Sequence, residues 1–353
     1  MAAGHCPGMA EFARLSLPLD TPPMEAKLTD AIPTGEDWQF EPKWDGFRCL
    51  AFRDGGSVEL MSKSGKPLGR YFPEVVEALL QLDEPRFVLD GELVLPMGDV
   101  LSFADLQLRL HPAASRIEKL ARETPTQLML FDCLQLGRQD LRAEPLSARR
   151  AALESFMESA AGPRLLLSPV TTTREVAEQW FAHSGGALDG IVAKRRDEPY
   201  QSGERAMIKV KQQRTADCVV GGYRMSGGSV GSLLLGLYDH EGRLNYVGFT
   251  SSFSAAEKAN LLVELEPLQG ESAFTGSSPG GASRWSRGRS SEWVPLRPER
   301  VAEVVYDQVT GQRFRHGTTF YRWRPDKAPR QCTMDQLAHE LRPAALAEFL
   351  EPA

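Results

Sequence analysis

The chain has 353 residues, of which 42% are hydrophobic and 25% charged, and its formal net charge is -6. This length allows about two domains of ordinary size, and the composition excludes a disordered or fibrous protein. No apolar run approaches about 18 residues, and no basic region precedes an apolar run at the N-terminus, so neither a membrane span nor a secretory signal is predicted. We expect a cytoplasmic protein with no membrane partner.

The first part of the chain alternates predicted strands and helices. A hairpin turn, Asp54-Gly55-Gly56, separates strands at 47–52 and 58–61. The periodicity predicts further strands at 87–95, 128–134, 190–194 and 206–211. Helices are predicted at 72–82, at 147–157 with Ser147 as N-cap, and at 174–184, where Gly185-Gly186 ends the last one. The pattern predicts an α+β lobe with mainly antiparallel sheets over residues 1–212.

The second part of the chain consists of short predicted strands at 217–223, 232–238, 244–250 and 301–306. A single helix, at 255–265, lies between the third and fourth of them. A small barrel with a helix in that position is typical of an OB-fold, which we assign to residues 213–353. Residues 270–291, rich in glycine and serine, are predicted to form a polar loop.

The first segment with a chemical signature is Glu41-Pro42-Lys43-Trp44-Asp45-Gly46-Phe47-Arg48. It places Lys43 at the start of a predicted strand, and Lys43 and Asp45 face the same side of an extended backbone. Gly46 leaves space where a ligand can approach the backbone closely. A lysine amine becomes a nucleophile when burial or a nearby cation disfavours its charged form. The segment alone is equally compatible with a surface lysine in a turn.

Carboxylates interrupt two otherwise apolar strands, in Asp90-Gly91-Glu92 and in Asp189-Gly190. Buried charge is unfavourable unless it is paired or bound to metal. Glu92 and Asp189 are therefore candidates for binding a divalent cation or a ribose hydroxyl. Because each lies beside glycine, solvated turn carboxylates remain the alternative.

Two basic stretches, 194–214 and 313–330, stand out in a chain that is acidic overall. Within the first, the alternation of Met207-Ile208-Lys209-Val210-Lys211 directs two ammonium groups to one face of a strand. A triphosphate placed between Lys209 and Lys211 would relieve their repulsion. A solvated strand face is the alternative.

Together, these segments resemble the covalent nucleotidyltransferases, which comprise DNA ligases, RNA ligases and mRNA capping enzymes. Residues 43–46 are similar to the KxDG nucleophile motif of that superfamily. Its further motifs are matched in the same order by residues 62–66, 90–92, 131–132, 189–194, 209–211 and 322–327. Segments 41–48, 71–74 and 323–327 most resemble the bacterial ligase C branch of the ATP-dependent DNA ligases.

The resemblance implies a role for each matching residue. Lys43 would carry AMP, and the nucleotide would be bound by Glu41 at the adenine edge, Phe131 stacked on adenine, Arg48 and Glu92 at the ribose, and Lys209 and Lys211 at the α-phosphate. Glu92 and Asp189 would hold Mg²⁺ or Mn²⁺, Lys63 would contact a 5'-phosphate, and Asp326 and Lys327 would orient the departing pyrophosphate. Two positions depart from the family pattern, since Lys63 replaces the usual arginine and Asp189 replaces a frequent glutamate.

The function that the resemblance implies is ATP-dependent DNA ligation in DNA repair. ATP would adenylate Lys43, and the AMP would pass to the 5'-phosphate of nicked double-stranded DNA before the 3'-hydroxyl displaces it. We expect a monomer in the bacterial cytoplasm, at the nucleoid. The alternatives are an RNA ligase, a capping-type nucleotidyltransferase, or a non-catalytic OB-fold DNA-binding protein.

Overall fold

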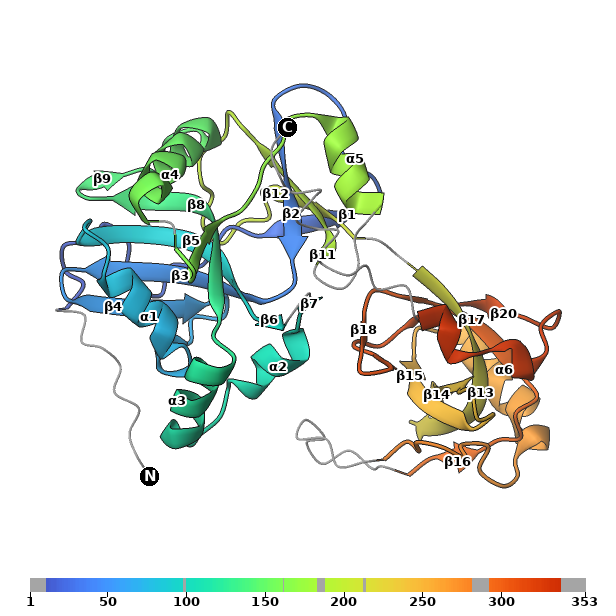
Figure 1. Cartoon of the computed structure of the whole chain (residues 1–353). Helices are drawn as coiled ribbons and strands as arrows, with labels where there is room; N and C mark the ends of the chain where they lie inside the picture. The colour runs from blue at the N-terminus through green and yellow to red at the C-terminus, as the bar shows by residue number, and fades with distance from the viewer. Residues whose placement is uncertain are drawn as a thin grey trace. The chain divides into compact units, whose positions relative to one another are not determined.

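The computed structural model describes residues 11–97, 100–160, 162–182, 188–211, 214–280 and 292–337. These residues form two compact units (Figure 1), of which the first contains the described residues up to Lys211 and the second lies within Gln212–Glu340. Among the described helices, none is long and apolar enough to cross a membrane.

One sheet of the first unit has four strands, in the order β1-β12-β11-β2. All pairings are antiparallel except that of β1 with β12. Helix α5 packs on β2 and β11 through Ala177 and Trp180. The elements are β1 (Ala26–Thr29), β2 (Trp38–Trp44), β11 (Leu188–Arg195), β12 (Met207–Val210) and α5 (Arg174–Ala182).

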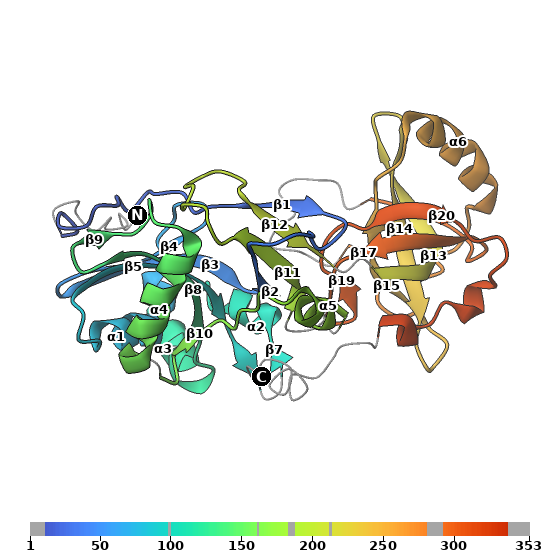
Figure 2. The ribbon, with the colours of Figure 1, turned by 90° about the horizontal axis from the view of Figure 1, so that it is seen from above.

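The other large sheet of this unit has the order β10-β8-β5-β3-β4, with β9 paired to β8. Helices α1 and α4 lie against it (Figure 2) and share a hydrophobic core with its strands. The elements are β3 (Phe47–Asp54), β4 (Ser57–Ser62), β5 (Arg86–Val94), β8 (Gln127–Leu136), β9 (Gln139–Asp140), β10 (Leu165–Leu167), α1 (Pro73–Leu80) and α4 (Leu146–Ala160).

The two sheets meet through side chains that alternate along the strands. In β3, Cys49 and Ala51 belong to the core beneath the helices, whereas Leu50 and Phe52 belong to a second core that also contains Met207 of the other sheet. Successive strand residues point to opposite faces, so β3 is buried on both sides. The first unit is thus a two-sheet body, and β2 and β3 connect one sheet to the other.

The second unit contains a five-stranded sheet in the order β15-β14-β13-β17-β20. Its edges approach where Thr318 donates its backbone N–H to the carbonyl of Phe249, at 3.0 Å. Helix α6 begins with a capping box between Ser254 and Glu257. The α+β lobe and the OB-fold region predicted from the sequence are confirmed. The strands are β13 (Arg214–Ser226), β14 (Ser229–Tyr238), β15 (Leu244–Thr250), β17 (Val301–Tyr306) and β20 (Thr319–Trp323), and the helix is α6 (Ala255–Leu265).

Shorter elements complete both units. The first contains β6 (Pro96–Met97), β7 (Val100–Leu101), α2 (Phe103–Leu108), α3 (Ala114–Glu123) and the 3-10 turn η1 (Gly69–Tyr71). The second contains β16 (Val294–Pro295), β18 (Val309–Thr310), β19 (Arg313–Phe314), η2 (Glu266–Leu268), η3 (Pro329–Gln331) and η4 (Met334–Leu337).

Some local predictions need correction. Ser147 is the second residue of α4 rather than its N-cap, because the helix begins at Leu146. Asp45 lies beyond the end of β2, so strand alternation does not relate it to Lys43. The proposed glycine stop at 185–186 and residues 281–291 of the predicted loop lie outside the described residues.

Candidate active site

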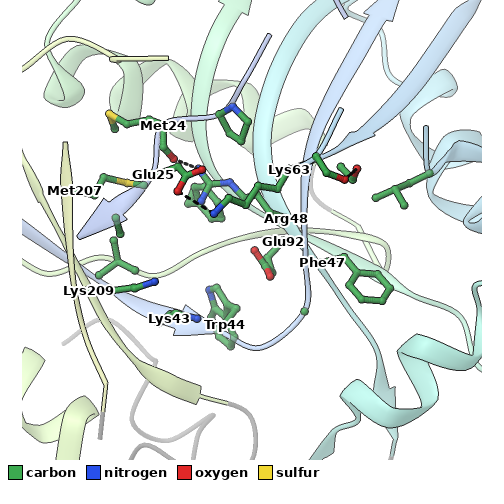
Figure 3. A pocket seen from close by; sticks show the side chains of 18 of the residues that line it. Met24, Glu25, Lys43, Trp44, Phe47, Arg48, Lys63, Glu92, Met207 and Lys209 are labelled. Atoms are coloured by element: carbon green, nitrogen blue, oxygen red, sulfur yellow. Dashed lines mark hydrogen bonds and ion pairs between the residues drawn. The ribbon is translucent and has the colours of Figure 1, made fainter. Parts of the chain in front are cut away.

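A pocket of about 760 Å³ lies within the first unit and is lined from both of its large sheets. Side chains of both sheets point into it, as Figure 3 shows for Lys43 and Lys209 on one side and Glu92 on the other. Of the residues predicted to bind nucleotide or phosphate, the lining includes Glu41, Lys43, Arg48, Lys63, Glu92, Phe131 and Lys209. The fold therefore brings together residues far apart in the sequence.

Lys43 lies near the end of β2, where its neighbour β11 is irregular. The register between these strands shifts between Leu188 and Ile191, and this bulge places Oδ2 of Asp189 2.6 Å from Nζ of Lys43. Gly190 has φ +138°, and a Cβ there would lie 2.0 Å from the carbonyl oxygen of Val210. Only glycine fits this position. The bulge thus gives the predicted nucleophile a carboxylate partner.

The cationic strand end predicted at 209–211 lies beside the same carboxylate. Nζ of Lys211 is 2.9 Å from Oδ2 of Asp189, the oxygen that also contacts Lys43. Lys209 lines the pocket, where burial and then the charges of Lys43 and Lys211 lower its pKa. Three ammonium groups near one carboxylate favour binding of an anion with several charges.

Glu92 occupies β5 directly opposite Arg48 of β3. Burial raises the pKa of Glu92 to about 7, although the charges of Lys43 and Arg48 oppose the shift. Gly46 lies close to Glu92, and a Cβ there would lie 2.0 Å from the carbonyl oxygen of Leu93. A side chain at residue 46 would therefore clash with β5, so glycine is required there by the packing of the backbone. The sequence had predicted a different reason, the close approach of a ligand.

Arg48 is held by a carboxylate to which the sequence alone assigned no role. Asp90 is fully buried, and its two oxygens accept hydrogen bonds of 2.6 Å each from Nε and Nη2 of Arg48. Tyr200 donates to Asp90 at 2.7 Å and accepts from the backbone N–H of Met24 at 2.9 Å. Burial alone would lower the pKa of Arg48, but Asp90 raises it. A bidentate pair of this kind fixes the guanidinium in one orientation.

Phe131 and Glu41 meet at Lys194, another residue to which the sequence alone assigned no role. Nζ of Lys194 lies 2.8 Å from Oε2 of Glu41 and 4.5 Å from the centre of the Phe131 ring. Gln39 donates to the other oxygen of Glu41 at 2.8 Å. The side chains of Glu41 and Lys194 are only 3% and 4% exposed. The sequence does contain a signal for Lys194. This lysine lies near the end of the apolar strand β11, where a charged side chain requires a buried partner.

Lys63 lies at a more open part of the pocket. It is 3.0 Å from Oε2 of Glu25, and its side chain is 58% exposed. The hydrogen bond from Lys63 lowers the pKa of Glu25. Lys63 is thus an exposed cation on the pocket wall, with a carboxylate partner that an incoming phosphate would have to replace.

The predicted pyrophosphate-binding residues belong to the second unit. Arg324 binds Asp326 at 2.8 Å, and Nζ of Lys327 donates to Oδ2 of Asp217 at 2.6 Å. The hydrogen bond from Arg324 lowers the pKa of Asp326 to about 2. Both predicted residues are therefore charged and engaged within their own unit.

One of the two carboxylates predicted to hold metal, Glu92, lines the pocket, and the other, Asp189, is ion-paired with Lys43 and Lys211. In the described part of the chain, no group of three or more His, Cys, Asp and Glu side chains is placed to hold a metal. However, Glu92 is a partly buried carboxylate facing the pocket, and a cation would favour its ionised form. Two carboxylates supplemented by substrate phosphate oxygens are a usual environment for Mg²⁺.

Two family models match the chain, one in each of its two units. The model for the ATP dependent DNA ligase domain matches residues 23–211, which is more than half of the chain, and the model for the ATP dependent DNA ligase C terminal region matches residues 226–327. The chain belongs to the ATP-dependent DNA ligases.

Full-length relatives narrow this assignment to the ligase C type. The chain is 48% identical to DNA ligase C2 of Mycolicibacterium smegmatis, over 92% of this chain and 96% of that protein. It is 45% identical to DNA ligase C of Mycobacterium tuberculosis, over 93% and 97%. A solved structure from the Lig E DNA ligases shares the fold, with a TM-score of 0.54 and 18% identity over 85% of this chain and 99% of that one. The resemblance predicted from the sequence is thus confirmed.

Proposed function

We propose that this ligase uses Lys43 as its nucleophile and seals 5'-phosphate/3'-hydroxyl nicks in double-stranded DNA through three phosphoryl transfers. The amine of Lys43 attacks the α-phosphate of ATP, so that an N–P bond forms and pyrophosphate departs. The 5'-phosphate at the nick then takes AMP from Lys43. The 3'-hydroxyl finally displaces AMP and closes the strand. The observation that carries this proposal is the 2.6 Å contact of Lys43 with Asp189 on a pocket containing Glu92 and Lys209.

The ion pair of Lys43 has a direct consequence for the first transfer. While Asp189 remains the counterion, it stabilises the ammonium form of Lys43, which is not a nucleophile. A divalent ion, Mg²⁺ or Mn²⁺, held by Glu92 and Asp189 would supply positive charge at the α-phosphate. If Asp189 held that ion, Lys43 would lose its counterion and would lie among other cations, a setting that would favour the neutral amine. Lys209 and Lys211 bind the phosphate oxygens.

The remaining residues orient the nucleotide. Phe131 stacks on adenine, and Arg48, locked by Asp90, binds the ribose together with Glu92. Glu41 lies at the adenine edge with Lys194 as its buried partner. A carboxylate accepts from the exocyclic amine of adenine, whereas guanine presents a carbonyl at that position. We therefore propose that the pocket selects ATP over GTP.

The other parts of the proposal concern DNA and the second unit. Lys63 contacts the 5'-phosphate, and the exposed basic residues grip the DNA backbone without reading sequence. Asp326 and Lys327 orient the departing pyrophosphate during the first transfer. We take 1–212 as the adenylation domain and 213–353 as the OB-fold domain.

Labelling with α-³²P-ATP and metal tests the nucleophile. We expect wild-type protein to retain the label covalently, GTP to give none, and Lys43→Ala to give none with either nucleotide. Sealing of ordinary nicked DNA is lost in Lys43→Ala, whereas DNA adenylated in advance is still joined because it bypasses the lysine. Lys27→Ala, which removes an exposed lysine of β1, is the matched control and retains the label.

The outcomes separate the proposal from its alternatives. A labelled Lys43→Ala protein would assign the nucleophile elsewhere. Preferential labelling with GTP would indicate capping-type chemistry. A side-by-side assay on nicked DNA and nicked RNA duplexes would reveal an RNA ligase if only the RNA strand were sealed, and no label with any nucleotide would favour a binding module.

A further inference from the structure

Asp217 is an acidic residue of the second unit, and both its backbone N–H and its backbone carbonyl are hydrogen-bonded to one side chain. It lies in β13, and its side chain is 10% exposed. The side chain of Gln336 accepts a hydrogen bond from the backbone N–H of Asp217 at 2.9 Å and donates one to its carbonyl at 3.0 Å. The Asp217 side chain therefore starts from a fixed point of the barrel.

Asp217 lies directly opposite a second acid. In the register of β13 and β17 its partner is Glu303, which in turn faces Arg322 of β20. Like charges opposite one another on adjacent strands are destabilising. Two acids at this place are tolerated because cations bridge them, and Nη1 of Arg324 contacts Asp217 at 2.9 Å and Glu303 at 3.4 Å.

Both oxygens of Asp217 are used, each by a different cation of segment 322–327. Oδ1 accepts from Arg324 at 2.9 Å, and Oδ2 accepts from Nζ of Lys327 at 2.6 Å. Arg324 extends the arrangement, since its Nη2 lies 2.8 Å from Asp326. One carboxylate thus holds Lys327 directly and Asp326 through Arg324.

The side chains of this network differ in how far they are exposed to solvent. The side chain of Asp326 is 64% exposed, and that of Lys327 is 27% exposed, whereas Asp217 is nearly covered. Charged side chains are commonly exposed, but here the two outer members are the residues proposed to act on pyrophosphate, and the carboxylate that holds them is the covered one. The arrangement is that of an inner carboxylate supporting an outer pair that can meet a ligand.

We propose that Asp217 is a positioning residue for the adenylation step, which it serves by orienting Lys327 and, through Arg324, Asp326. This inference rests on the proposed function, in which those two residues act on the departing pyrophosphate. Asp217 itself touches no substrate. Its removal should therefore slow the formation of lysyl-AMP, and it should leave untouched the sealing of a nick that already carries AMP.

The test compares these two steps in Asp217→Asn, which keeps the shape and removes the charge. We expect the rate of lysyl-AMP formation at saturating ATP to fall on the order of 10- to 100-fold, as is typical of a misplaced catalytic group. The KM for ATP changes less than about threefold, because the loss falls on the transition state. Sealing of pre-adenylated nicked DNA stays within about twofold of wild type.

Two further variants sharpen the test. Asp217→Glu keeps the charge but displaces it by one methylene, so we expect a smaller loss confined to the same step, and this variant serves if Asp217→Asn is unfolded. In a Lys327→Ala and Arg324→Ala background, Asp217→Asn should produce no further loss of adenylation, since it acts through those residues. Asp239→Asn is the matched control, because it breaks an exposed Asp–Arg pair of the same unit, at 3.0 Å from Arg243, and should adenylate at the wild-type rate.

Equal losses in adenylation and in sealing of pre-adenylated DNA would overturn the inference and assign Asp217 a structural role only. Wild-type adenylation in both Asp217 variants would overturn it as well. These results differ from failure of the proposed function itself, in which the wild-type protein would form no lysyl-AMP at all.

Discussion

Two lysine–carboxylate pairs join strands β2 and β11. In one pair the lysine belongs to β2, and in the other it belongs to β11. The outer pair joins Lys43 of β2 to Asp189 of β11, and the inner pair joins Glu41 of β2 to Lys194 of β11. The lysine of the outer pair is 24% exposed, whereas that of the inner pair is 4% exposed. A lysine and a carboxylate on the same two strands therefore lie in two different settings. The outer pair is the one we propose to meet the nucleotide, and the inner pair is buried in the pocket wall.

The inner pair should have the largest effect on stability. Lys194→Met leaves the Glu41 carboxylate buried with Gln39 as its remaining partner, so we expect the free energy of unfolding to fall by about 3–5 kcal/mol. Denaturation in urea measures it. Removing both charges in Glu41→Gln with Lys194→Met should recover part of the loss. If Lys194→Met were as stable as wild type, the inner pair would not be the more stabilising of the two.

Glu92 faces the outer pair and should make stability depend on pH. Because burial raises its pKa to about 7, the folded protein binds more protons than the unfolded chain between about pH 4.5 and pH 7. The free energy of unfolding therefore falls as pH rises through that window. Without metal or nucleotide, we expect Glu92→Gln to be more stable than wild type by about 1–3 kcal/mol at pH 8, and the difference to vanish below pH 4.

Unfolding curves of both proteins at several pH values measure this difference. Glu77→Gln, at an exposed position of α1, is the control and should differ from wild type equally at every pH. A difference for Glu92→Gln that does not change with pH would place the ionised carboxylate in a solvated setting.

The outer pair should matter less for folding than for chemistry. Asp189 is 5% exposed, but its lysine partners Lys43 and Lys211 are partly exposed and can be solvated, so Asp189→Asn is expected to lower the free energy of unfolding by about 1–2 kcal/mol. The same variant should slow lysyl-AMP formation on the order of 10- to 100-fold, because it weakens the proposed metal site. Urea denaturation and labelling with ATP measure the two quantities on one preparation. A stability loss as large as that of Lys194→Met would show that the outer pair is structural too.

An exposed ion pair on the same pocket should have the smallest effect on the free energy of unfolding. Glu25 and Lys63 are 3.0 Å apart but largely solvated, and such pairs contribute little. We expect Glu25→Gln to change the free energy of unfolding by less than about 0.5 kcal/mol, with no dependence on salt beyond that of wild type. Thermal unfolding in low and high salt measures it. A loss greater than that of Asp189→Asn would contradict the expectation that burial sets the strength of these pairs.

Local pattern explains how far the sequence could predict the fold. The alternation of apolar residues located β3, β5 and β8, and the three- and four-residue spacing located α1. It did not reveal β2 as a strand, because Pro42 interrupts the alternation of Trp38-Gln39-Phe40-Glu41, and proline is unusual inside a paired strand. That strand is stabilised by its pairing with β11, which is a long-range effect.

The sequence by itself determined the types of chemical group and their order, because motif spacing and strand period are properties of the chain alone. It thereby identified the ligase family, and it singled out Lys43 and the carboxylates at 92 and 189 as candidate site residues. Only the tertiary structure decided which charges meet, because pairing across strands depends on register and on the bulge beside Gly190. For this reason the contacts of Asp90, Lys194 and Asp217 emerged only from the folded protein.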